Sequence, residues 1–397
     1  KPPGMLPRTS PPPRVPTATS DEQRATEEAC HTAVDKWLDE HGALARDSLS
    51  LSRASHVAFL NSGLRELPSG YCSLDASRPW ICYWIIHSLE MLREPRADEL
   101  EEDVVRFLAS CQDPSGGFCG GPFPGQSPHL APTYAAVNTL VTIGTESAYR
   151  AIDRESLRRF LLRMKTAEGG FTMHEDGEAD VRGSYTALAV ASLCNLWTDE
   201  LVEGAAEFVA SCQTYEGGIG ATPGEEAHGG YTFCGLAAMV LLNRVELLRV
   251  PHMMDWLVRR QMAVHGGFQG RTNKLVDSCY SFWQGGAFPL IQSALEARGE
   301  LPETGVRSLF STTGLFDYIL TCSQSPQGGL RDKPGRGSDY YHTCYALSGY
   351  AVCAAEPPSP GSEGVPAHWP AAVDFVNPVY NVSAAKAAKA LEYFCPS

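Results

Sequence analysis

Two kinds of helical segment alternate along residues 70–350. Segments of the first kind, such as residues 156–163 (SLRRFLLR), place apolar residues at helical spacing on one side and charges on the other. Segments of the second kind, such as residues 231–242 (YTFCGLAAMVLL), are apolar almost all round and contain small residues that permit close packing. The first pattern predicts outer helices with one solvent-facing side, and the second predicts inner helices that are covered on all sides.

A Gly-Gly pair separates the two kinds of segment in each copy. The pairs stand at residues 116–117, 169–170, 217–218, 266–267 and 328–329. A polar loop follows each pair, and an apolar helix then opens with an aromatic residue, at Tyr134, Tyr185, Tyr231, Tyr280 and within 341–345. Five copies at a period of about 50 residues predict a helical repeat architecture. An all-α fold, an α/α barrel with an inner ring of helices wrapped by an outer ring, buries the inner helices, whereas a straight solenoid would expose one of their sides.

Two low-complexity stretches stand outside the repeats. Residues 1–20 contain seven prolines and are predicted to form a disordered arm. Residues 356–370 are rich in proline and glycine and predict a surface insertion. We expect residues 21–397 to form a single barrel domain.

Composition narrows the class of protein. Hydrophobic residues make up 43% and charged residues 20% of the chain, which is enough apolar surface for a large core. The net charge of −14 argues against binding to nucleic acid or to anionic membranes. Thirteen cysteines without a CxxC pair, and no apolar run long enough to span a membrane, indicate a reduced, cytoplasmic protein with no integral membrane association.

Basic residues stand out against this acidic background. If the inner helices run parallel, their amino-terminal ends share one rim, where unpaired N–H groups favour anions. Four basic residues precede these helix starts at related repeat positions: Arg182, His228, Arg271 and Lys274. They predict a phosphate or diphosphate site, although surface loops also carry arginine and lysine without binding anions.

Aromatic residues occupy the same helix ends. They are Trp80, Trp84, Tyr134, Tyr185, Tyr231, Tyr280, Phe282, Trp283, Tyr341 and Tyr345. Such residues are as often ordinary core as ligand contacts. An apolar cavity that they line beneath a group of cations would suit a long hydrocarbon tail with an anionic head, as in an isoprenoid diphosphate.

A third set of residues has metal-ligand chemistry. Asp277 and Cys279 precede one inner helix, and His342 occupies the equivalent place in the last repeat. One carboxylate, one thiolate and one imidazole would hold zinc with a fourth position open, as catalytic zinc sites do. The spacing alone is a weak signal, because Asp277 could cap its helix and Cys279 could be one more buried thiol.

Long stretches of the chain resemble the β subunits of protein farnesyltransferases. They include residues 75–90 (DASRPWICYWIIHSLE), 228–239 (HGGYTFCGLAAM), 266–286 (GGFQGRTNKLVDSCYSFWQGG) and 328–349 (GGLRDKPGRGSDYYHTCYALSG). The resemblance covers most of residues 70–350 and continues in residues 376–382 (VNPVYNV).

The resemblance implies a transfer of farnesyl from farnesyl diphosphate to the cysteine of a C-terminal CaaX motif. It implies one zinc ion held by Asp277, Cys279 and His342, whose open position takes the substrate sulfur. It assigns the diphosphate to His228, Arg271, Lys274 and Tyr280, and a magnesium ion beside the diphosphate to Asp332.

The resemblance also implies how the two substrates lie. The farnesyl tail would contact Trp80, Tyr134, Arg182, Tyr185, Cys234, Trp283 and Tyr345, and the peptide would contact Trp84, Arg182 and Tyr341. Trp80, Tyr345 and Asp332 resemble the residues of family members that transfer farnesyl rather than those of members that transfer geranylgeranyl. We therefore expect CaaX proteins such as small GTPases, with a last residue such as Ser, Met, Gln or Ala.

Family members work as heterodimers with a helical-repeat α subunit, so the resemblance implies that partner here. Three alternatives stay open. They are a geranylgeranyl-transferring relative, a terpene cyclase on the same barrel type, and a non-catalytic helical scaffold. A cyclase needs DxDD or DDxxD motifs, and this chain contains no Asp-Asp pair.

Overall fold

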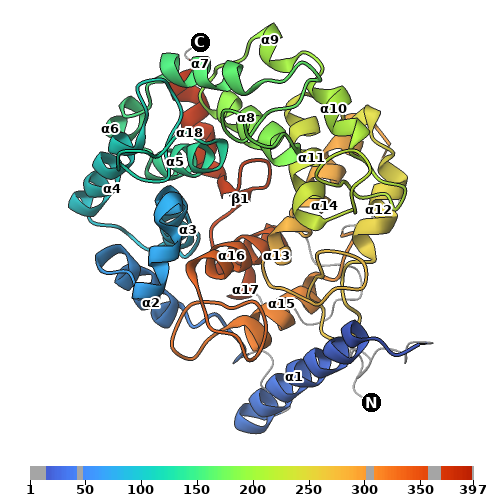
Figure 1. The fold of residues 1–397 in the computed structure, drawn as a ribbon. Helices are drawn as coiled ribbons and strands as arrows, with labels where there is room; N and C mark the ends of the chain where they lie inside the picture. The colour runs from blue at the N-terminus through green and yellow to red at the C-terminus, as the bar shows by residue number, and fades with distance from the viewer. Residues whose placement is uncertain (1–14, 43–47, 301–307, 356–367, 396–397) are drawn as a thin grey trace.

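The fold is a closed ring of helix pairs, seen end-on in Figure 1. The computed structural model describes residues 15–42, 48–300, 308–355 and 368–395. The inner ring consists of α3 (Arg78–Met91), α5 (Leu130–Ile143), α8 (Val181–Leu193), α11 (Gly229–Leu241), α13 (Tyr280–Trp283) with α14 (Ala287–Ala297), and α16 (Tyr340–Ala355). Each of these helices packs on the next, and α16 returns to α3. The predicted all-α barrel is confirmed.

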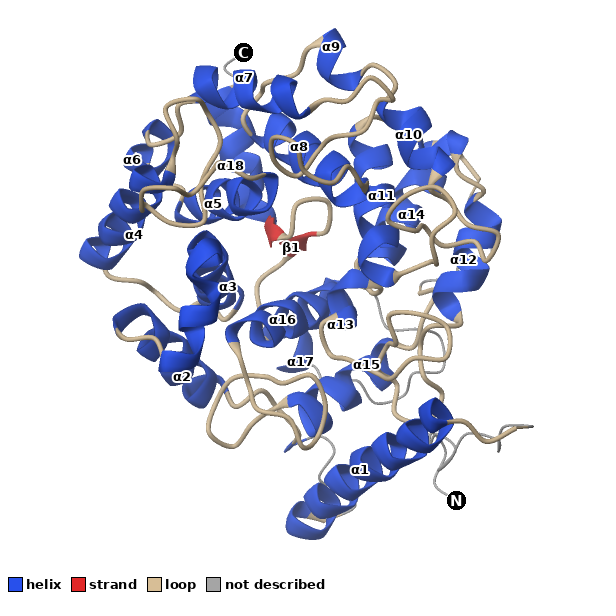
Figure 2. Cartoon of the chain, in the orientation of Figure 1, coloured by secondary structure: helices blue, strands red, loops and turns tan. Residues whose placement is uncertain are grey.

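An outer ring of helices covers the inner ring (Figure 2). It consists of α2 (Arg53–Arg65), α4 (Asp98–Cys111), α7 (Arg154–Met164), α10 (Ala205–Ser211), α12 (Val250–Val258), and α15 (Thr312–Asp317) with the π-helical turn η4 (Tyr318–Ser323). Shorter or peripheral elements are α1 (Ala18–His41), η2 (Ser69–Ser77), α6 (Glu146–Arg150), α9 (Asp199–Val202), η3 (Val245–Leu247), α17 (His368–Ala371) and α18 (Ala384–Phe394). No helix in the described part of the chain combines the length and the apolarity needed to cross a bilayer.

The two hydrophobic patterns sort the helices as predicted. In α7 the buried side chains include Leu157, Phe160, Leu161 and Met164, which recur at helical spacing on one face. In α5 every residue except Ala131 is buried. Outer helices therefore cover the core with one face, while inner helices lie within it.

The first glycine of every Gly-Gly pair lets the chain pass close to the next outer helix. These glycines have φ between 78° and 110°, a region that L side chains rarely adopt. A Cβ atom there would lie 1.9–2.3 Å from a backbone carbonyl oxygen, of Ser156, Gly204, His252, Gly314 and Ser55 in turn. The second glycine faces an aromatic ring of that outer helix: Phe160, Phe208, Trp256, Tyr318 and Phe59. The fifth pair meets α2, so this contact also closes the ring.

Glutamine side chains also join each Gly-Gly turn to the start of the next outer helix. The amide oxygen of Gln213 accepts the N–H of Arg249 (2.8 Å), and its nitrogen donates to the Arg249 carbonyl (3.3 Å), just before α12 begins. Gln112 and Gln261 make the same pair of bonds to Asp153 and Ser311. Gln324 bonds to Ser52 and Ser50 ahead of α2.

A short hairpin near the carboxyl end lies inside the ring (Figures 1 and 2). Its strands β1 (Val376–Asn377) and β2 (Val382–Ser383) are antiparallel, with Val376 opposite Ser383. Three inner helices hold its tip by tyrosine hydroxyls: Tyr185 donates to the Val379 carbonyl (2.8 Å), Tyr134 to that of Tyr380 (2.7 Å) and Tyr83 to that of Asn381 (2.6 Å). The hairpin is thus a fixed part of the barrel interior.

The predicted starts of several inner helices were wrong. Helices α5 and α8 begin at Leu130 and Val181 rather than at their tyrosines, because His129 and Asp180 cap them one turn earlier. Helix α11 begins at Gly229 after the N-cap His228, and α16 begins at Tyr340. The aromatic residues therefore lie inside the first turns and face the ring interior.

The predicted arm and insertion need correction at their edges. Residues 1–14 lie outside the described residues, but α1 starts at Ala18 with a capping box between Thr17 and Ser20, so the arm cannot extend to residue 20. Residues 356–367 also lie outside the described residues, and His368–Ala371 is helical rather than loop.

The close approach at the Gly-Gly turns can be tested with a matched pair of substitutions. Gly217→Ala adds a Cβ that would lie 2.1 Å from the His252 carbonyl oxygen, whereas Gly224→Ala, at a similar positive φ of 89°, meets nothing within 4 Å. We expect Gly224→Ala to lower the free energy of unfolding by about 1–2 kcal/mol. Gly217→Ala should lower it by roughly 3–5 kcal/mol. Urea unfolding measures both, and equal losses would contradict the role of the contact.

Candidate active site

The amino-terminal ends of the inner helices form one rim of the barrel. The first N–H of α3, α5, α8 and α11, and that of the turn leading into α13, donates to a carbonyl in the loop of the next repeat. These bonds run from Arg78 to Gly120, Leu130 to Met173, Val181 to Ala221, Gly229 to Gly270 and Ser278 to Asp332. The loops that carry the candidate site residues are therefore tied to one another around the rim.

This bonding corrects one expectation about the rim. The first N–H of α5, α8 and α11 is used by the neighbouring loop, and the second is accepted by the capping side chains of His129, Asp180 and His228. Backbone N–H groups at these positions are not free for an anion. At the starts of α5, α8 and α11, a preference for anions must therefore come from side chains rather than from these N–H groups.

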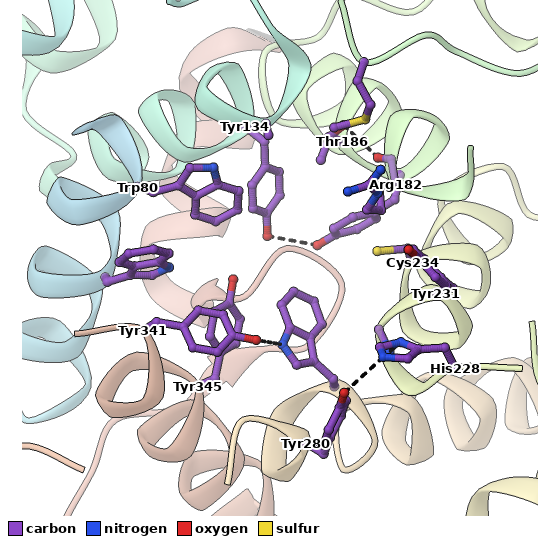
Figure 3. Close-up of a pocket in the computed structure, with 16 residues that line it drawn as sticks. Trp80, Tyr134, Arg182, Thr186, His228, Tyr231, Cys234, Tyr280, Tyr341 and Tyr345 are labelled. Atoms are coloured by element: carbon purple, nitrogen blue, oxygen red, sulfur yellow. Dashed lines mark hydrogen bonds between the residues drawn. The ribbon is translucent and has the colours of Figure 1, made fainter. Parts of the chain in front are cut away.

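A cavity of about 440 Å³ opens inside the ring (Figure 3). It is lined by Trp80, Trp84, Ala131, Tyr134, Met173, Arg182, Tyr185, Thr186, His228, Gly230, Tyr231, Cys234, Tyr280, Trp283, Tyr341 and Tyr345. Every residue predicted to contact the tail or the peptide is in this set. Ala131, Met173, Thr186 and Gly230 were missed, because nothing in their chemistry sets them apart. Only their repeat positions, in the first two turns of an inner helix or in the loop before it, could have indicated them.

Packed aromatic rings form the cavity wall. Trp80 lies against Trp84 and Tyr134, with ring centroids 5.8 and 5.7 Å apart. Across the cavity, Trp283 and Tyr345 are 4.4 Å apart, and the Trp283 Nε1–H donates to the Tyr341 hydroxyl (3.2 Å). The rings fix one another, so the wall is apolar and has a defined shape.

The predicted basic residues differ in how much charge they leave free. Arg182 forms hydrogen bonds to both carboxylate oxygens of Asp180 and an ion pair with Glu178 (3.2 Å). Arg271 pairs with Glu226 (2.9 Å), while Lys274 is exposed. Arg182 thus faces two carboxylates and Arg271 faces one, so Lys274 carries the least offset positive charge among these predicted basic residues.

His228 acts here as a neutral donor. Burial and the nearby Arg271 lower the pKa of His228 to about 4. Its Nδ1 accepts the Gly230 N–H (3.0 Å), so the neutral ring carries its proton on Nε2, which lies 3.0 Å from the Tyr280 hydroxyl oxygen. With Nε2 as the donor, the Tyr280 hydroxyl keeps its own proton for another acceptor.

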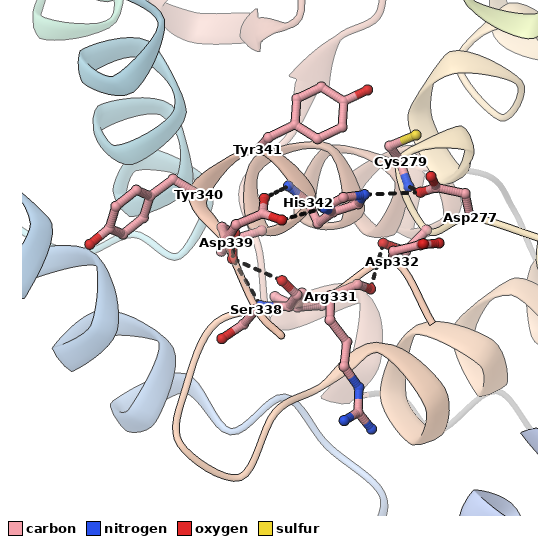
Figure 4. Close-up of polar contacts among 12 residues, drawn as sticks. Asp277, Cys279, Arg331, Asp332, Ser338, Asp339, Tyr340, Tyr341 and His342 are labelled. Carbon is pink, nitrogen blue, oxygen red and sulfur yellow. Dashed lines mark hydrogen bonds and ion pairs between the residues drawn. The ribbon is translucent and has the colours of Figure 1, made fainter. Parts of the chain in front are cut away.

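The three candidate metal ligands meet on the same rim (Figure 4). Ligand atoms of Asp277, Cys279 and His342 all lie within 4.8 Å of one another. Asp277 Oδ1 is 3.3 Å from His342 Nε2 and accepts the Cys279 N–H (2.9 Å). Two neighbouring inner helices, α13 and α16, thus bring together residues that are far apart in sequence.

Burial and hydrogen bonds set the protonation of these three groups. Burial and the neighbouring Asp277 raise the pKa of Cys279 well above its usual value. Burial opposes protonation of His342, but its bonds to Asp277 and Asp339 outweigh this and raise its pKa to about 10. A divalent cation would replace the shared proton, so the donor set and its spacing fit zinc.

Asp339 is a site residue that the sequence did not reveal. Its Oδ2 is 2.6 Å from His342 Nδ1, and its Oδ1 accepts the His342 backbone N–H (2.7 Å). This contact turns Nε2 of the imidazole toward Asp277 and Cys279. A carboxylate three residues before a candidate histidine is the signal that could have found it.

Asp332 lies beside these ligands but outside the three-residue group. Its carboxylate pairs with Lys333 (2.5 Å). Burial and the nearby Asp277 raise the pKa of Asp332. One carboxylate oxygen, Oδ1, is buried without a hydrogen-bond partner. The residue therefore retains a donor atom that could contact a cation.

Comparison with known proteins identifies the family. The family described as Prenyltransferase alpha-alpha toroid domain matches residues 51–382. The protein farnesyltransferase β subunit of Pisum sativum is 44% identical over 80% of this chain and 89% of its own length, and that of Arabidopsis thaliana is 45% identical over 77% and 73%. A solved structure of Candida albicans protein geranylgeranyltransferase-I complexed with GGPP covers 87% of this chain and 99% of its own, with a TM-score of 0.72 and 23% identity, a likeness of fold. The chain belongs to the prenyltransferase α/α-toroid family, among the β subunits of protein farnesyltransferases.

Proposed function

We propose that this chain transfers farnesyl from farnesyl diphosphate to the cysteine thiol of proteins that end in CaaX, as the catalytic subunit of a heterodimer with an α subunit. One observation carries the proposal: an aromatic-walled cavity opens at a rim that bears the Asp277, Cys279 and His342 ligand set and the cations Arg271 and Lys274. The apolar cavity suits the farnesyl tail, the cations suit the diphosphate, and the metal ligand set suits the substrate thiol. In the reaction a bond forms between the substrate sulfur and carbon 1 of farnesyl, the bond from carbon 1 to oxygen breaks, and diphosphate leaves.

Asp277, Cys279 and His342 would hold one zinc ion, and Asp339 would orient His342 for it. Zinc would supply the Lewis acidity that keeps a substrate thiol deprotonated at neutral pH. The ligand set uses three protein donors, which leaves a coordination position for that sulfur.

The diphosphate would lie against Arg271, Lys274, His228 and Tyr280. The two cations offset its charge, and the Tyr280 hydroxyl donates a hydrogen bond to an oxygen on which charge develops as the bond to carbon 1 breaks. His228 supports this role by donating from Nε2 to Tyr280. We also propose that Asp332 contributes to a magnesium site beside the diphosphate, using the carboxylate oxygen that has no partner.

The tail would lie along the aromatic wall, and the peptide would enter past Trp84, Arg182 and Tyr341. Trp80 and Tyr345 are bulky cavity residues, so they favour the farnesyl chain over the longer geranylgeranyl chain. We place the reaction in the cytoplasm. The thirteen cysteines support this, because none forms a disulfide.

The zinc site is tested by metal content. We expect one zinc per chain in the heterodimer and none in Cys279→Ala, because the remaining carboxylate and imidazole cannot hold the ion alone. Cys212→Ala removes another buried thiol away from the site and should retain full zinc. Elemental analysis after dialysis measures both, and full zinc in Cys279→Ala would remove the assignment.

Donor choice is tested at Trp80. Replacing the indole with the threonine side chain removes a large part of the cavity wall. Trp80→Thr should raise kcat/KM for geranylgeranyl diphosphate relative to farnesyl diphosphate by at least about tenfold. Steady-state kinetics with both donors check this, and unchanged selectivity would show that Trp80 does not limit the chain length.

The function itself is tested by co-expressing the chain with candidate α subunits and assaying transfer of labelled farnesyl to a CaaX peptide. We expect transfer with the heterodimer and little or none with this chain alone. A peptide in which serine replaces the CaaX cysteine is the control. A stable heterodimer that transfers no label would favour a non-catalytic scaffold.

A further inference from the structure

Arg271 and Lys274 lie on one tight turn, residues 270–275, which we call the basic turn. A bridge between Gln269 and Val276 closes its base, and the Lys274 N–H donates to the Arg271 carbonyl (3.3 Å). Asn273, with φ of 60°, completes the reversal of the chain. The two cations thus occupy the first and last positions of a four-residue turn, and its backbone decides where both charges point.

The side chain of Gln269 fills the inside of the basic turn. This residue is 8% exposed, and its amide, with the nitrogen turned toward the carbonyls, donates to Lys274 O (2.6 Å) and Arg271 O (3.2 Å). Its own backbone carbonyl accepts from Gln284 Nε2 (3.2 Å) at the end of α13. The carbonyls of the two cationic residues are therefore fixed from within.

Thr272 fixes the turn from outside. Its hydroxyl accepts from Arg260 Nη1 (2.6 Å) and donates to Glu216 Oε2 (2.8 Å). Both partners belong to other parts of the ring: Arg260 follows α12, and Glu216 precedes the Gly-Gly pair of the preceding repeat. One hydroxyl therefore connects the middle of the basic turn to two elements outside it.

The partners of Thr272 are themselves held in place. Arg260 is 6% exposed, lies over the Trp256 ring (5.2 Å to the centroid), and accepts the Gln269 N–H on its carbonyl. Trp256 Nε1 donates to the same Glu216 oxygen (3.3 Å). A buried guanidinium, an indole and a carboxylate that contact one another have little freedom to move, so they can hold Thr272 in one position.

We propose that Thr272 is a positioning residue for the diphosphate: through Arg260 and Glu216 it holds the basic turn so that Arg271 and Lys274 converge on the leaving group. This inference rests on the proposed function. Thr272 does not contact the diphosphate itself and acts only by positioning Arg271 and Lys274. Charges fixed in advance stabilise an anion better than charges that must be brought together when it binds.

The test uses Thr272→Val, which keeps the shape of the side chain and removes both hydrogen bonds, in the purified heterodimer. We expect KM for farnesyl diphosphate and the Kd of inorganic pyrophosphate to rise about tenfold. KM for the CaaX peptide, zinc content and binding of farnesol, which has no charge, should stay within about twofold of the parent. Thr272→Ser keeps the hydroxyl and should restore the affinity for pyrophosphate.

Thr172→Val is the matched control, because that rim hydroxyl bonds to the Met164 carbonyl (3.3 Å) in another repeat. It should leave pyrophosphate binding unchanged. Glu216→Gln provides a second variant if Thr272→Val does not fold, and it too should weaken pyrophosphate binding.

Two outcomes would overturn the proposal. One is unchanged pyrophosphate affinity in Thr272→Val or, where that variant does not fold, in Glu216→Gln. The other is an equal loss of affinity for pyrophosphate, farnesol and peptide, which would mean a general structural role. Pyrophosphate titration needs no turnover, so an inactive parent heterodimer would count against the proposed function and not against the positioning role.

Discussion

The barrel depends on the contact between each Gly-Gly turn and the next outer helix. At five places the backbone comes so close to a carbonyl oxygen that a single Cβ would not fit, and an aromatic ring covers the second glycine. This contact sets both the distance and the rotation from one helix pair to the next. Because the fifth turn makes it with α2, the same local geometry that stacks the repeats also closes them into a ring.

The packing of successive repeats places the candidate site residues. Asp277 and Cys279 belong to one repeat and His342 to the next, and their ligand atoms meet because α13 packs on α16. The basic turn belongs to the same rim, since Gly229 donates its N–H to the Gly270 carbonyl. Hydrogen bonds between successive loops limit independent movement of these groups. The rim therefore behaves as one framework that holds the candidate metal ligands and the basic turn side by side.

The sequence predicts the periodic parts of this molecule well. Helix pairs, inner and outer faces and the barrel follow from the Gly-Gly spacing and from the two hydrophobic patterns, because both reflect contacts that recur in every repeat. Helix starts were less predictable. Histidines such as His129 and His228 are unusual N-caps, so the predicted starts were placed at the tyrosines that follow them. Asp339 could have been found only from its spacing, three residues before His342. Thr272 and Arg260 could not be found from sequence alone, because their roles depend on contacts between elements that only the folded ring brings together. The charge state of His228 was not predictable for the same reason, since it follows from burial.

The contact of the last repeat with α2 also affects when the protein can complete its folding. The Ser52 N–H and the Gln324 side chain that accepts it are 272 residues apart in the chain. Such a contact forms only after nearly all of the protein has been synthesised, and the entropy of closing so long a loop must be overcome before the contact contributes any stability. Until then the apolar flanks of the first and last inner helices have no neighbour. Nascent chains of this protein therefore expose apolar surface on the first and last inner helices until late in synthesis. Ring closure is thus the stage at which binding by chaperones or by a partner subunit would best prevent aggregation.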